Sequence, residues 1–299
     1  MLPKILIIGG SGLLGSTLVQ YASDNYDVHI TVNKNTIESK KISITKIDLL
    51  EDRLAIINLI NNLKPDVIIN TVAYPNVDFC ETNPHMANVL HIDVTKDIAK
   101  VSKNINSKLI HFSTDAVFDG KLDRKYTEED LPNPINHYGK TRLKAESVVL
   151  TASELNVILR TTVIYGWHPK SRFTNWILQT LKDDKIVDPF TDQYNTPTLV
   201  DDLANSIFKI IQMQISGLYH AVGKTCISRY EFALKLADKF GFDKNLIKPV
   251  TSYEKKQDAP RPAKGCLDAQ KLEKKIGYDF CDIDTGIDFI LNKSGFTKM

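Results

Sequence analysis

The sequence predicts an α/β protein built around a doubly wound parallel sheet, with a smaller C-terminal lobe. Strand-like and helix-like segments alternate over residues 4–166, and the strand-like segments are apolar on both faces. Strands of that kind need helices on both sides of a parallel sheet. A glycine-rich turn between the first strand and the first helix also favours a Rossmann-like arrangement.

The alternation can be followed along the chain. Five runs rich in β-branched residues are expected to be strands: KILIIGG (4–10), DVHITVN (27–33), PDVIINTVA (65–73), KLIHFST (108–114) and NVILRTTVIYG (156–166). Four segments between them have the apolar spacing of helices: GLLGSTLVQYAS (12–23), EDRLAIINLINNLK (51–64), NVLHIDVTKDIAKVSKNIN (88–106) and INHYGKTRLKAESVVLTA (135–152).

The rhythm loosens after Gly166. Three further helices are predicted over residues 173–184, 200–214 and 228–241, with a short strand at 217–222 and a polar loop at 251–265. We therefore expect residues 1–165 to form the Rossmann domain, to which residues from about 198 to 220 return. Residues 166–299 are expected to be mainly a substrate-binding lobe woven into the sheet.

Composition excludes several classes of function. A net charge of +2 without a dense Lys/Arg tract argues against nucleic acid as a partner. The apolar start MLPKILIIGG is too short for a signal peptide or a membrane span, so a cytoplasmic location is expected. The four cysteines have no metal-site spacing, and we expect reduced thiols and no bound metal. A homodimer remains possible.

The glycine-rich turn predicts a dinucleotide site. Gly9, Gly12 and Gly15 follow a strand and open a helix, a pattern that lets backbone approach a pyrophosphate at the helix N-terminus. Ser11, Leu13 and Leu14 complete the predicted loop. Because the second strand ends in Asn33 and Lys34, without the acid typical of an NAD site, we expect NADPH, with NADH possible. Asp48, beside Leu49, could accept a hydrogen bond from the adenine amino group.

Polar residues at the predicted carboxyl edge of the sheet indicate where a reaction would occur. Ser113, Thr114 and Asp115 end a buried strand, where their hydroxyls could bind a substrate carbonyl, although such residues also cap turns. Tyr138 and Arg142 lie four residues apart and share a helix face. A cation beside a phenol lowers its pKa, so we expect Tyr138 to act as a general acid.

Seven ordered motifs resemble the extended short-chain dehydrogenase/reductases, most closely the dTDP-4-dehydrorhamnose reductase (RmlD-like) group. Besides the glycine loop they are NTVAYPNVDFCE, STDAVFDG, YGKTRLKAE, RTTVIYG, DQYNTPTLVDDLA and RPAKGCLD. The resemblance implies an NADPH-dependent reductase of a nucleotide-linked 4-keto-6-deoxy sugar. It makes Tyr138 the proton donor and Thr114 its hydroxyl partner, and it places the Arg142 cation beside the nicotinamide ribose.

The same resemblance assigns further residues by motif. Ala73 and Tyr74 would line the cofactor, and Arg261 would meet the substrate diphosphate. The residues implied to face the sugar nucleotide are Asp115, Arg160, Asp192 and Gln193. The nucleotide base, the sugar and the product stereochemistry do not follow from these motifs.

This sequence departs from the family pattern at several positions. Arg142 replaces the family lysine, Ala116 its tyrosine, Val163 its tryptophan, Asn195 its glycine, and Lys264–Gly265 its Asn-Ser. Two alternatives therefore stay open. One is a non-catalytic dinucleotide-binding subunit like the regulatory β subunit of methionine adenosyltransferase. The other is a sugar-nucleotide epimerase or dehydratase that keeps its NAD bound.

Overall fold

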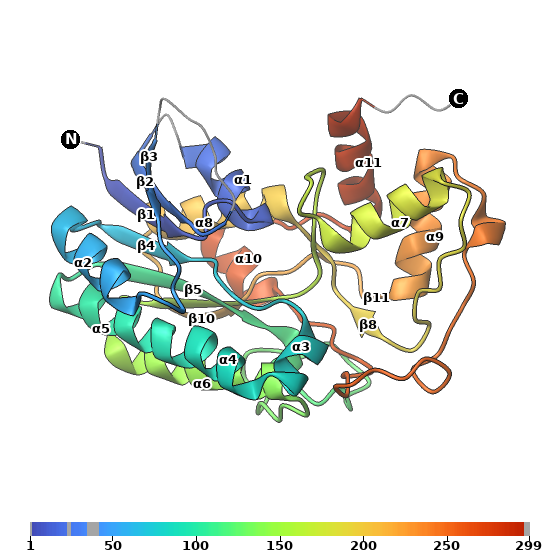
Figure 1. Ribbon diagram of the computed structural model, residues 1–299. Helices are drawn as coiled ribbons and strands as arrows, with labels where there is room; N and C mark the ends of the chain where they lie inside the picture. The colour runs from blue at the N-terminus through green and yellow to red at the C-terminus, as the bar shows by residue number, and fades with distance from the viewer. Residues whose placement is uncertain (1, 23–24, 35–41, 296–299) are drawn as a thin grey trace.

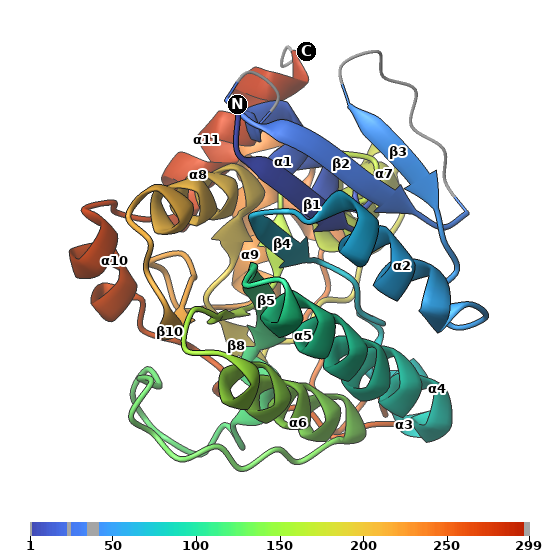
Figure 2. The same ribbon diagram turned by 90° about the vertical axis from the view of Figure 1, so that its left-hand side faces the viewer.

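A seven-stranded parallel sheet forms the centre of the molecule (Figures 1 and 2). The computed structural model describes residues 2–22, 25–34 and 42–295. The strand order β10-β6-β5-β4-β1-β2-β3 places β1 in the interior of the sheet. The chain adds strands on one side of β1 as far as β3 and then, from β4 onward, on the other side. The predicted doubly wound α/β fold is confirmed, and the switch point between β1 and β4 is where such sheets bind ligands.

The sheet strands and the helices packed around the sheet have the following bounds. The strands are β1 (Lys4–Ile8), β2 (Asp27–Val32), β3 (Ser43–Lys46), β4 (Val67–Asn70), β5 (Lys108–Thr114), β6 (Val157–Thr161) and β10 (Gly217–His220). The helices are α1 (Leu13–Ala22), α2 (Arg53–Leu63), α3 (Val77–Thr82), α4 (Pro84–Asn88), α5 (Val94–Asn104), α6 (His137–Ala152), α8 (Val200–Gln212) and α10 (Gln270–Ile276). A π-helical turn, η1 (Val89–Asp93), joins α4 to α5, and a 3₁₀ turn, η2 (Asp115–Val117), follows β5.

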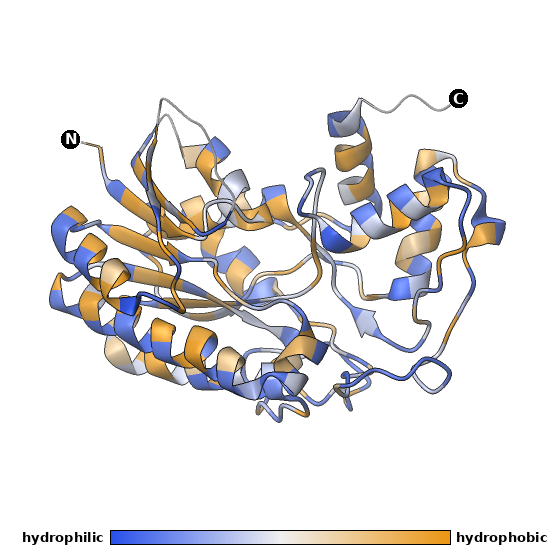
Figure 3. Cartoon of the chain, in the orientation of Figure 1, coloured by the Kyte–Doolittle hydropathy of each residue, from blue (hydrophilic) through white to orange (hydrophobic). Residues whose placement is uncertain are grey.

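Two apolar layers cover the two faces of the sheet. Ile5 and Ile7 of β1 pack into the cluster that includes α1 and α8. Leu6 and Ile8 alternate with them and pack into the cluster that includes α2 and α5. Figure 3 shows the resulting concentration of hydrophobic residues on the central strands. This double burial explains why the strand sequences are apolar without alternation.

A smaller lobe with its own core stands beside the sheet (Figure 1). Its helices are α7 (Arg172–Lys182), α9 (Arg229–Phe240) and α11 (Ile283–Ser294), and a 3₁₀ turn, η3 (Lys244–Leu246), follows α9. Two pairs of short strands link the lobe to the rest of the chain. In one pair β7 (Ile164–Tyr165) lies beside β9 (Thr198–Leu199), and in the other β8 (Tyr194–Asn195) lies beside β11 (Ile227–Ser228). Between these lobe elements, α8 and β10 return to the main sheet.

The expectation of four reduced thiols is wrong for one pair. Cys226 and Cys266 form a disulfide with a Cα–Cα distance of 5.6 Å, while Cys80 and Cys281 are free. The two bonded cysteines are 40 residues apart, so their spacing in the sequence carries no signal. The fold brings them together because Cys226 directly precedes β11, which pairs with one side of β8, and Cys266 follows Lys264, which pairs with the other side of β8.

The described residues offer neither a membrane-spanning helix nor a metal site. None of the helices that the structure describes is long and apolar enough to cross a membrane. Within the same ranges, no group of three or more His, Cys, Asp or Glu side chains is arranged to hold a metal ion.

Candidate active site

The glycine turn after β1 has the geometry that close backbone approach requires. Gly9 has a φ of +90°, in a region that residues with a Cβ rarely adopt. A Cβ on Gly15 would lie 2.3 Å from the Gly9 carbonyl oxygen, so only glycine lets α1 start this close to β1. The turn is closed by the Gly12 N–H, which donates to the Gly9 oxygen over 3.0 Å. The N-terminus of α1 is thereby presented at the carboxyl edge of the sheet, where it can bind a phosphate.

A pocket of about 260 Å³ opens beside this turn, at the carboxyl ends of the first four strands. Eight of the residues predicted to bind cofactor line it: Gly9, Ser11, Gly12, Asn33, Asp48, Leu49, Ala73 and Tyr74. Thr31, Thr71, Val72 and Leu90 also line it and were not predicted. Thr31, Thr71 and Val72 could have been found as the last residues of β2 and the first after β4.

The other predicted cofactor residues lie outside this pocket. Leu14 is buried in the apolar layer under α1, and Leu13 packs against the same layer. The structure therefore places both leucine side chains on the core side of the loop, and the backbone N–H groups of these first residues of α1 are what they can offer to a phosphate.

Two of the predicted residues are hydrogen-bonded to each other at the end of the pocket where the adenosine is expected. The Asn33 amide donates to a carboxylate oxygen of Asp48 over 3.2 Å. The other Asp48 oxygen accepts from the Leu50 N–H at 3.0 Å, which holds the carboxylate at the pocket wall. Lys34 follows Asn33 and is exposed. Among the described residues directly after β2, Asn33 and Lys34, the charged one is a cation and neither is the acid expected in an NAD site.

The reacting end brings Thr114 and Tyr138 together from different elements. Asn136 caps α6 by accepting from the Gly139 N–H at 2.8 Å, which sets the first turn that carries Tyr138. A Cβ on Gly139 would meet the Ala116 carbonyl oxygen, so glycine lets α6 pack directly on η2 after Thr114. Among the causes that lower the pKa of Tyr138, the Arg142 charge is the largest, and the neighbouring Thr114 side chain adds to it.

The net pKa shift of Tyr138 is upward, opposite to the one predicted. Burial is the largest cause and raises the pKa of the phenol above its usual value, against the effect of Arg142. The nearby Asp115 carboxylate raises it further. The sequence shows the cation four residues away but not the loss of water around the phenol. Tyr138 therefore stays protonated at neutral pH, as a proton donor must be.

Arg142 lies in the interior, only 2% exposed. Its Nη2 donates to the Phe112 carbonyl oxygen, whereas Nε and Nη1 have no partner. Buried N–H donors without acceptors are costly. A dinucleotide offers ribose hydroxyl oxygens that could accept them, so these orphaned donors fit the predicted cofactor.

Two neutral histidines surround this cation. His91 accepts from the Tyr74 N–H at 3.0 Å and contacts the Thr141 hydroxyl at 2.8 Å through its other ring nitrogen. Burial, reinforced by the Arg142 charge, lowers the pKa of His91 to about 2 and that of His111 well below its usual value. The π-helical turn η1 carries His91, and such turns occur frequently at functional sites.

Ser113 and Arg160 do not reach an open surface. They are register partners in β5 and β6 and lie on the face opposite to Thr114. Arg160 pairs with both oxygens of Glu146, at 2.9 and 2.7 Å, and Ser113 donates to the same carboxylate. All three side chains are buried. The structure thus corrects the expectation that Ser113 and Arg160 bind substrate, because strand alternation turns them into an internal ion-pair network.

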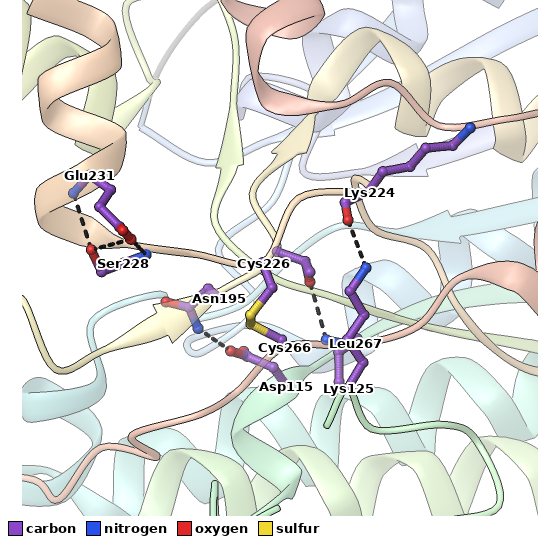
Figure 4. Close-up of a disulfide and its surroundings, with 10 residues drawn as sticks. Asp115, Lys125, Asn195, Lys224, Cys226, Ser228, Glu231, Cys266 and Leu267 are labelled. Carbon is purple, nitrogen blue, oxygen red and sulfur yellow. Dashed lines mark hydrogen bonds between the residues drawn. A yellow bond between two sulfur atoms is a disulfide. The ribbon is translucent and has the colours of Figure 1, made fainter. Parts of the chain in front are cut away.

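Both carboxylate oxygens of Asp115 accept hydrogen bonds, and Figure 4 shows the one that Asn195 donates. The Thr114 hydroxyl donates to Oδ1 over 2.9 Å, and the Asn195 amide donates to Oδ2 over 2.6 Å. Burial raises the pKa of Asp115, while hydrogen bonds from Thr162 and Thr114 and the Arg229 charge oppose that rise.

Arg229 is a site residue that the sequence did not reveal. It begins α9, and its guanidinium stacks on the Phe173 ring with the carbon 5.3 Å from the ring centroid. Burial lowers the pKa of Arg229 to about 10, against the field of Asp115. The capping box of Ser228 and Glu231 could have located the start of α9, but not the direction in which Arg229 points.

The last three predicted residues lie on or beside one loop. Asp192 accepts from the N–H and hydroxyl of Ser252, at 2.8 and 3.0 Å. Gln193 donates to the Ser252 hydroxyl at 3.0 Å and to the Gln257 side chain at 2.6 Å. Arg261 pairs with Asp78 of α3 at 2.8 Å. The polar loop over residues 251–263 thereby runs from the lobe to the sheet domain, as Figure 1 shows.

Comparisons with known proteins give one consistent picture. The family model described as the RmlD substrate binding domain matches residues 3–295. A dTDP-4-dehydrorhamnose reductase of Aggregatibacter actinomycetemcomitans is 30% identical, over 93% of this chain and 95% of that protein. Methionine adenosyltransferase 2 subunit beta of Xenopus laevis is 32% identical, over 91% of this chain and 82% of its own.

A solved structure extends the likeness to three dimensions. The dTDP-4-dehydrorhamnose reductase of Bacillus anthracis, in complex with NADP, superposes with a TM-score of 0.85 at 25% identity. The match covers 98% of this chain and 100% of that one.

Proposed function

The chain belongs to the RmlD substrate binding domain family, and from that membership we propose that it reduces the 4-keto group of a nucleotide-linked 6-deoxy sugar with NADPH. It is an NAD(P)H-dependent oxidoreductase of the Rossmann type. Residues 1–165, with residues from about 198 to 220, hold the cofactor. Most of residues 166–299 hold the substrate, through the residues beside Asp115 and the loop that carries Arg261.

The observation that carries the proposal is a buried cation that shares a helix face with a phenol. Tyr138 and Arg142 lie four residues apart on α6, and Arg142 has two N–H donors left without a protein acceptor. These donors and the glycine turn fit the ribose and the pyrophosphate of a dinucleotide. The chemistry that bound NADPH would supply is the donation of a hydride to the keto carbon.

The side chains of this protein account for the proton. Reduction turns the keto oxygen into an alkoxide, and the Tyr138 hydroxyl gives its proton to that oxygen. The raised pKa keeps the phenol protonated before the reaction. The Arg142 charge then stabilises the phenolate that remains. Arg142 cannot itself relay a proton at physiological pH, so it contributes charge and position alone.

The test is an assay of NADPH oxidation. Purified protein is mixed with dTDP- or UDP-linked 4-keto-6-deoxyglucose, together with an epimerase where the substrate needs one. Tyr138→Phe removes the hydroxyl that donates the proton and keeps the ring, and we expect it to slow turnover by about 10²- to 10⁴-fold. The proposal fails if the wild type and Arg142→Lys both show no turnover above Tyr138→Phe.

A second candidate is a non-catalytic regulatory subunit. It is favoured by the 32% identity to methionine adenosyltransferase 2 subunit beta and by Arg142 at the position of the family lysine. In that case we expect bound dinucleotide but no turnover with any keto sugar, and a methionine adenosyltransferase would form a stable complex with the protein. Size-exclusion chromatography of the mixed proteins distinguishes the two candidates.

A further inference from the structure

Arg229 is held in place from two sides, where α7 and α9 lie side by side in the lobe (Figure 1). It is the first residue of α9, and its backbone N–H donates to the Gln193 carbonyl oxygen over 3.2 Å. Its guanidinium carbon lies 5.3 Å from the centre of the Phe173 ring, and that ring is stacked on Phe232 of the lobe core. A guanidinium that stacks on a ring keeps its edge free to donate hydrogen bonds.

No oxygen of the described residues accepts from that edge. Within this part of the chain Arg229 has no side-chain hydrogen bond and no ion pair; its side chain contacts the Phe173 ring alone. The Asp115 carboxylate attracts the Arg229 charge from a distance, while the neighbouring Arg261 charge repels it. The protein therefore supplies only part of the negative charge that this cation needs.

The place of Arg229 in α9 adds a second cost. The N-terminus of a helix carries a partial positive charge, so a cation in the first turn is repelled. The acid of that turn is already used, because the Glu231 carboxylate accepts from the N–H and the hydroxyl of Ser228, at 2.9 and 2.8 Å. Burial also removes water from the Arg229 guanidinium. An anion bound against this side chain would offset all of these costs.

Arg261, the arginine expected at the substrate diphosphate, has its partners within the protein. Its Nη2 pairs with Asp78 over 2.8 Å, and its Nη1 donates to the Ala259 carbonyl oxygen over 2.7 Å. The other Asp78 oxygen accepts from the Ala259 N–H at 3.0 Å. Asp78 thus neutralises Arg261 and fastens its loop to α3. Of these two neighbouring arginines, Arg229 is the one without a counter-ion.

We propose that Arg229 binds the diphosphate of the nucleotide-linked substrate, and that Arg261 anchors its loop to α3. The inference deepens the proposed function and rests on it, because the diphosphate belongs to that class of substrate. The guanidinium fork offers parallel N–H donors that match two phosphate oxygens. Arg229 does not line the cofactor pocket, so the anion it receives is separate from the pyrophosphate of the dinucleotide.

The test is a calorimetric titration of dTDP and of UDP into protein saturated with NADP⁺, which keeps both probes out of the cofactor pocket. Arg229→Gln should raise the Kd of the diphosphate that binds by about 10- to 100-fold, the effect of losing hydrogen bonds to a charged group. Arg229→Lys keeps the charge and loses the fork, so its Kd should lie between those two values. Arg172→Gln, which removes an exposed charge beside Phe173, is the matched control and should bind like the wild type. An unchanged Kd for NADP⁺ shows that each variant is folded.

Arg261→Gln separates the two arginines. It should raise the Kd of the diphosphate less than Arg229→Gln does, and it should lower the urea midpoint of unfolding because Asp78 loses its partner. The proposal is overturned if Arg261→Gln weakens binding as much as Arg229→Gln, or if the wild type binds neither dTDP nor UDP.

The reductase assay gives an independent result. If Arg229→Gln weakens diphosphate binding while the wild type reduces no keto sugar, the anion site stands and the reductase function fails. If the wild type reduces a keto sugar and Arg229→Gln leaves both the KM of that sugar and the Kd of the diphosphate unchanged, the reductase function stands and the role of Arg229 is overturned.

Discussion

Reduction of the disulfide between Cys226 and Cys266 should destabilise the protein and slow its reaction more than it weakens cofactor binding. Cys226 is exposed and offers a reductant access to the bond, whereas Cys266 is buried. The bond joins the segment next to Gly265 to the segment before α9, and both segments lie beside Asp115. Neither cysteine lines the cofactor pocket.

The magnitude follows from the length of chain that the bond closes. The cysteines are 40 residues apart. For a loop of that length, the chain-entropy relation gives about 13 cal/mol/K, or about 4 kcal/mol at 25 °C, as the stability lost on reduction. A loss of that size corresponds to a fall in melting temperature of roughly 8–16 °C for a large domain.

The assay is thermal and urea unfolding with and without a phosphine reductant, alongside thiol titration under denaturing conditions. Two thiols, Cys80 and Cys281, should titrate before reduction, and all four cysteines afterwards. The Cys226→Ser/Cys266→Ser variant serves as the matched control, since it should behave like reduced wild type and ignore the reductant. The reasoning is refuted if oxidised wild type titrates four thiols, or if reduction leaves the unfolding midpoint in place.

Three further outcomes are expected. Lys34→Ala should lower the preference for NADPH over NADH about fivefold, since an exposed charge pair contributes about 1 kcal/mol; an unchanged ratio of the two Kd values would remove the charge argument. Burial lowers the pKa of His91 to about 2 and that of His220 to about 3, so both side chains stay neutral in the folded protein. In the unfolded chain the same side chains become protonated once the pH falls below the usual pKa of histidine, about 6.5. Their stabilisation is full above about pH 6.5, and each loses about 1.4 kcal/mol per pH unit as the pH falls from there toward 3. Urea midpoints at pH 7 and pH 5 should show this decline, and His220→Gln should make it shallower. Glu146→Gln leaves Arg160 buried without its counter-charge and should cost about 3–5 kcal/mol of unfolding free energy; a loss below about 1 kcal/mol would contradict a buried pair.

The fold was predictable because its signals are local. Strands that are apolar on both faces can only be covered by two layers of helices, and Gly9 and Gly15 mark the one turn where backbone must come close. The spacing of Tyr138 and Arg142 likewise follows from helical geometry alone. The roles of these and the other site residues stay predictions until the variants are assayed.

Other features depend on contacts between distant segments. Ser113 and Arg160 were expected at the substrate, but the register of β5 with β6 turns both toward Glu146. Arg229 looked like an ordinary helix residue, and only the packing of α9 brings its charge to Asp115. The Cys226–Cys266 bond had no signal in its spacing.

The sequence by itself predicted the apolar strands, the glycine turn after the first of them and the shared helix face of Tyr138 and Arg142, since each of these signals lies within one short segment. Tertiary structure alone decided which polar groups are shielded from water. Burial reversed the net pKa shift of Tyr138, kept the histidines around Arg142 neutral and left two Arg142 donors without an acceptor. The physical reason is that the cost of removing water from a charge depends on every segment packed around it, and no single stretch of sequence specifies that surrounding.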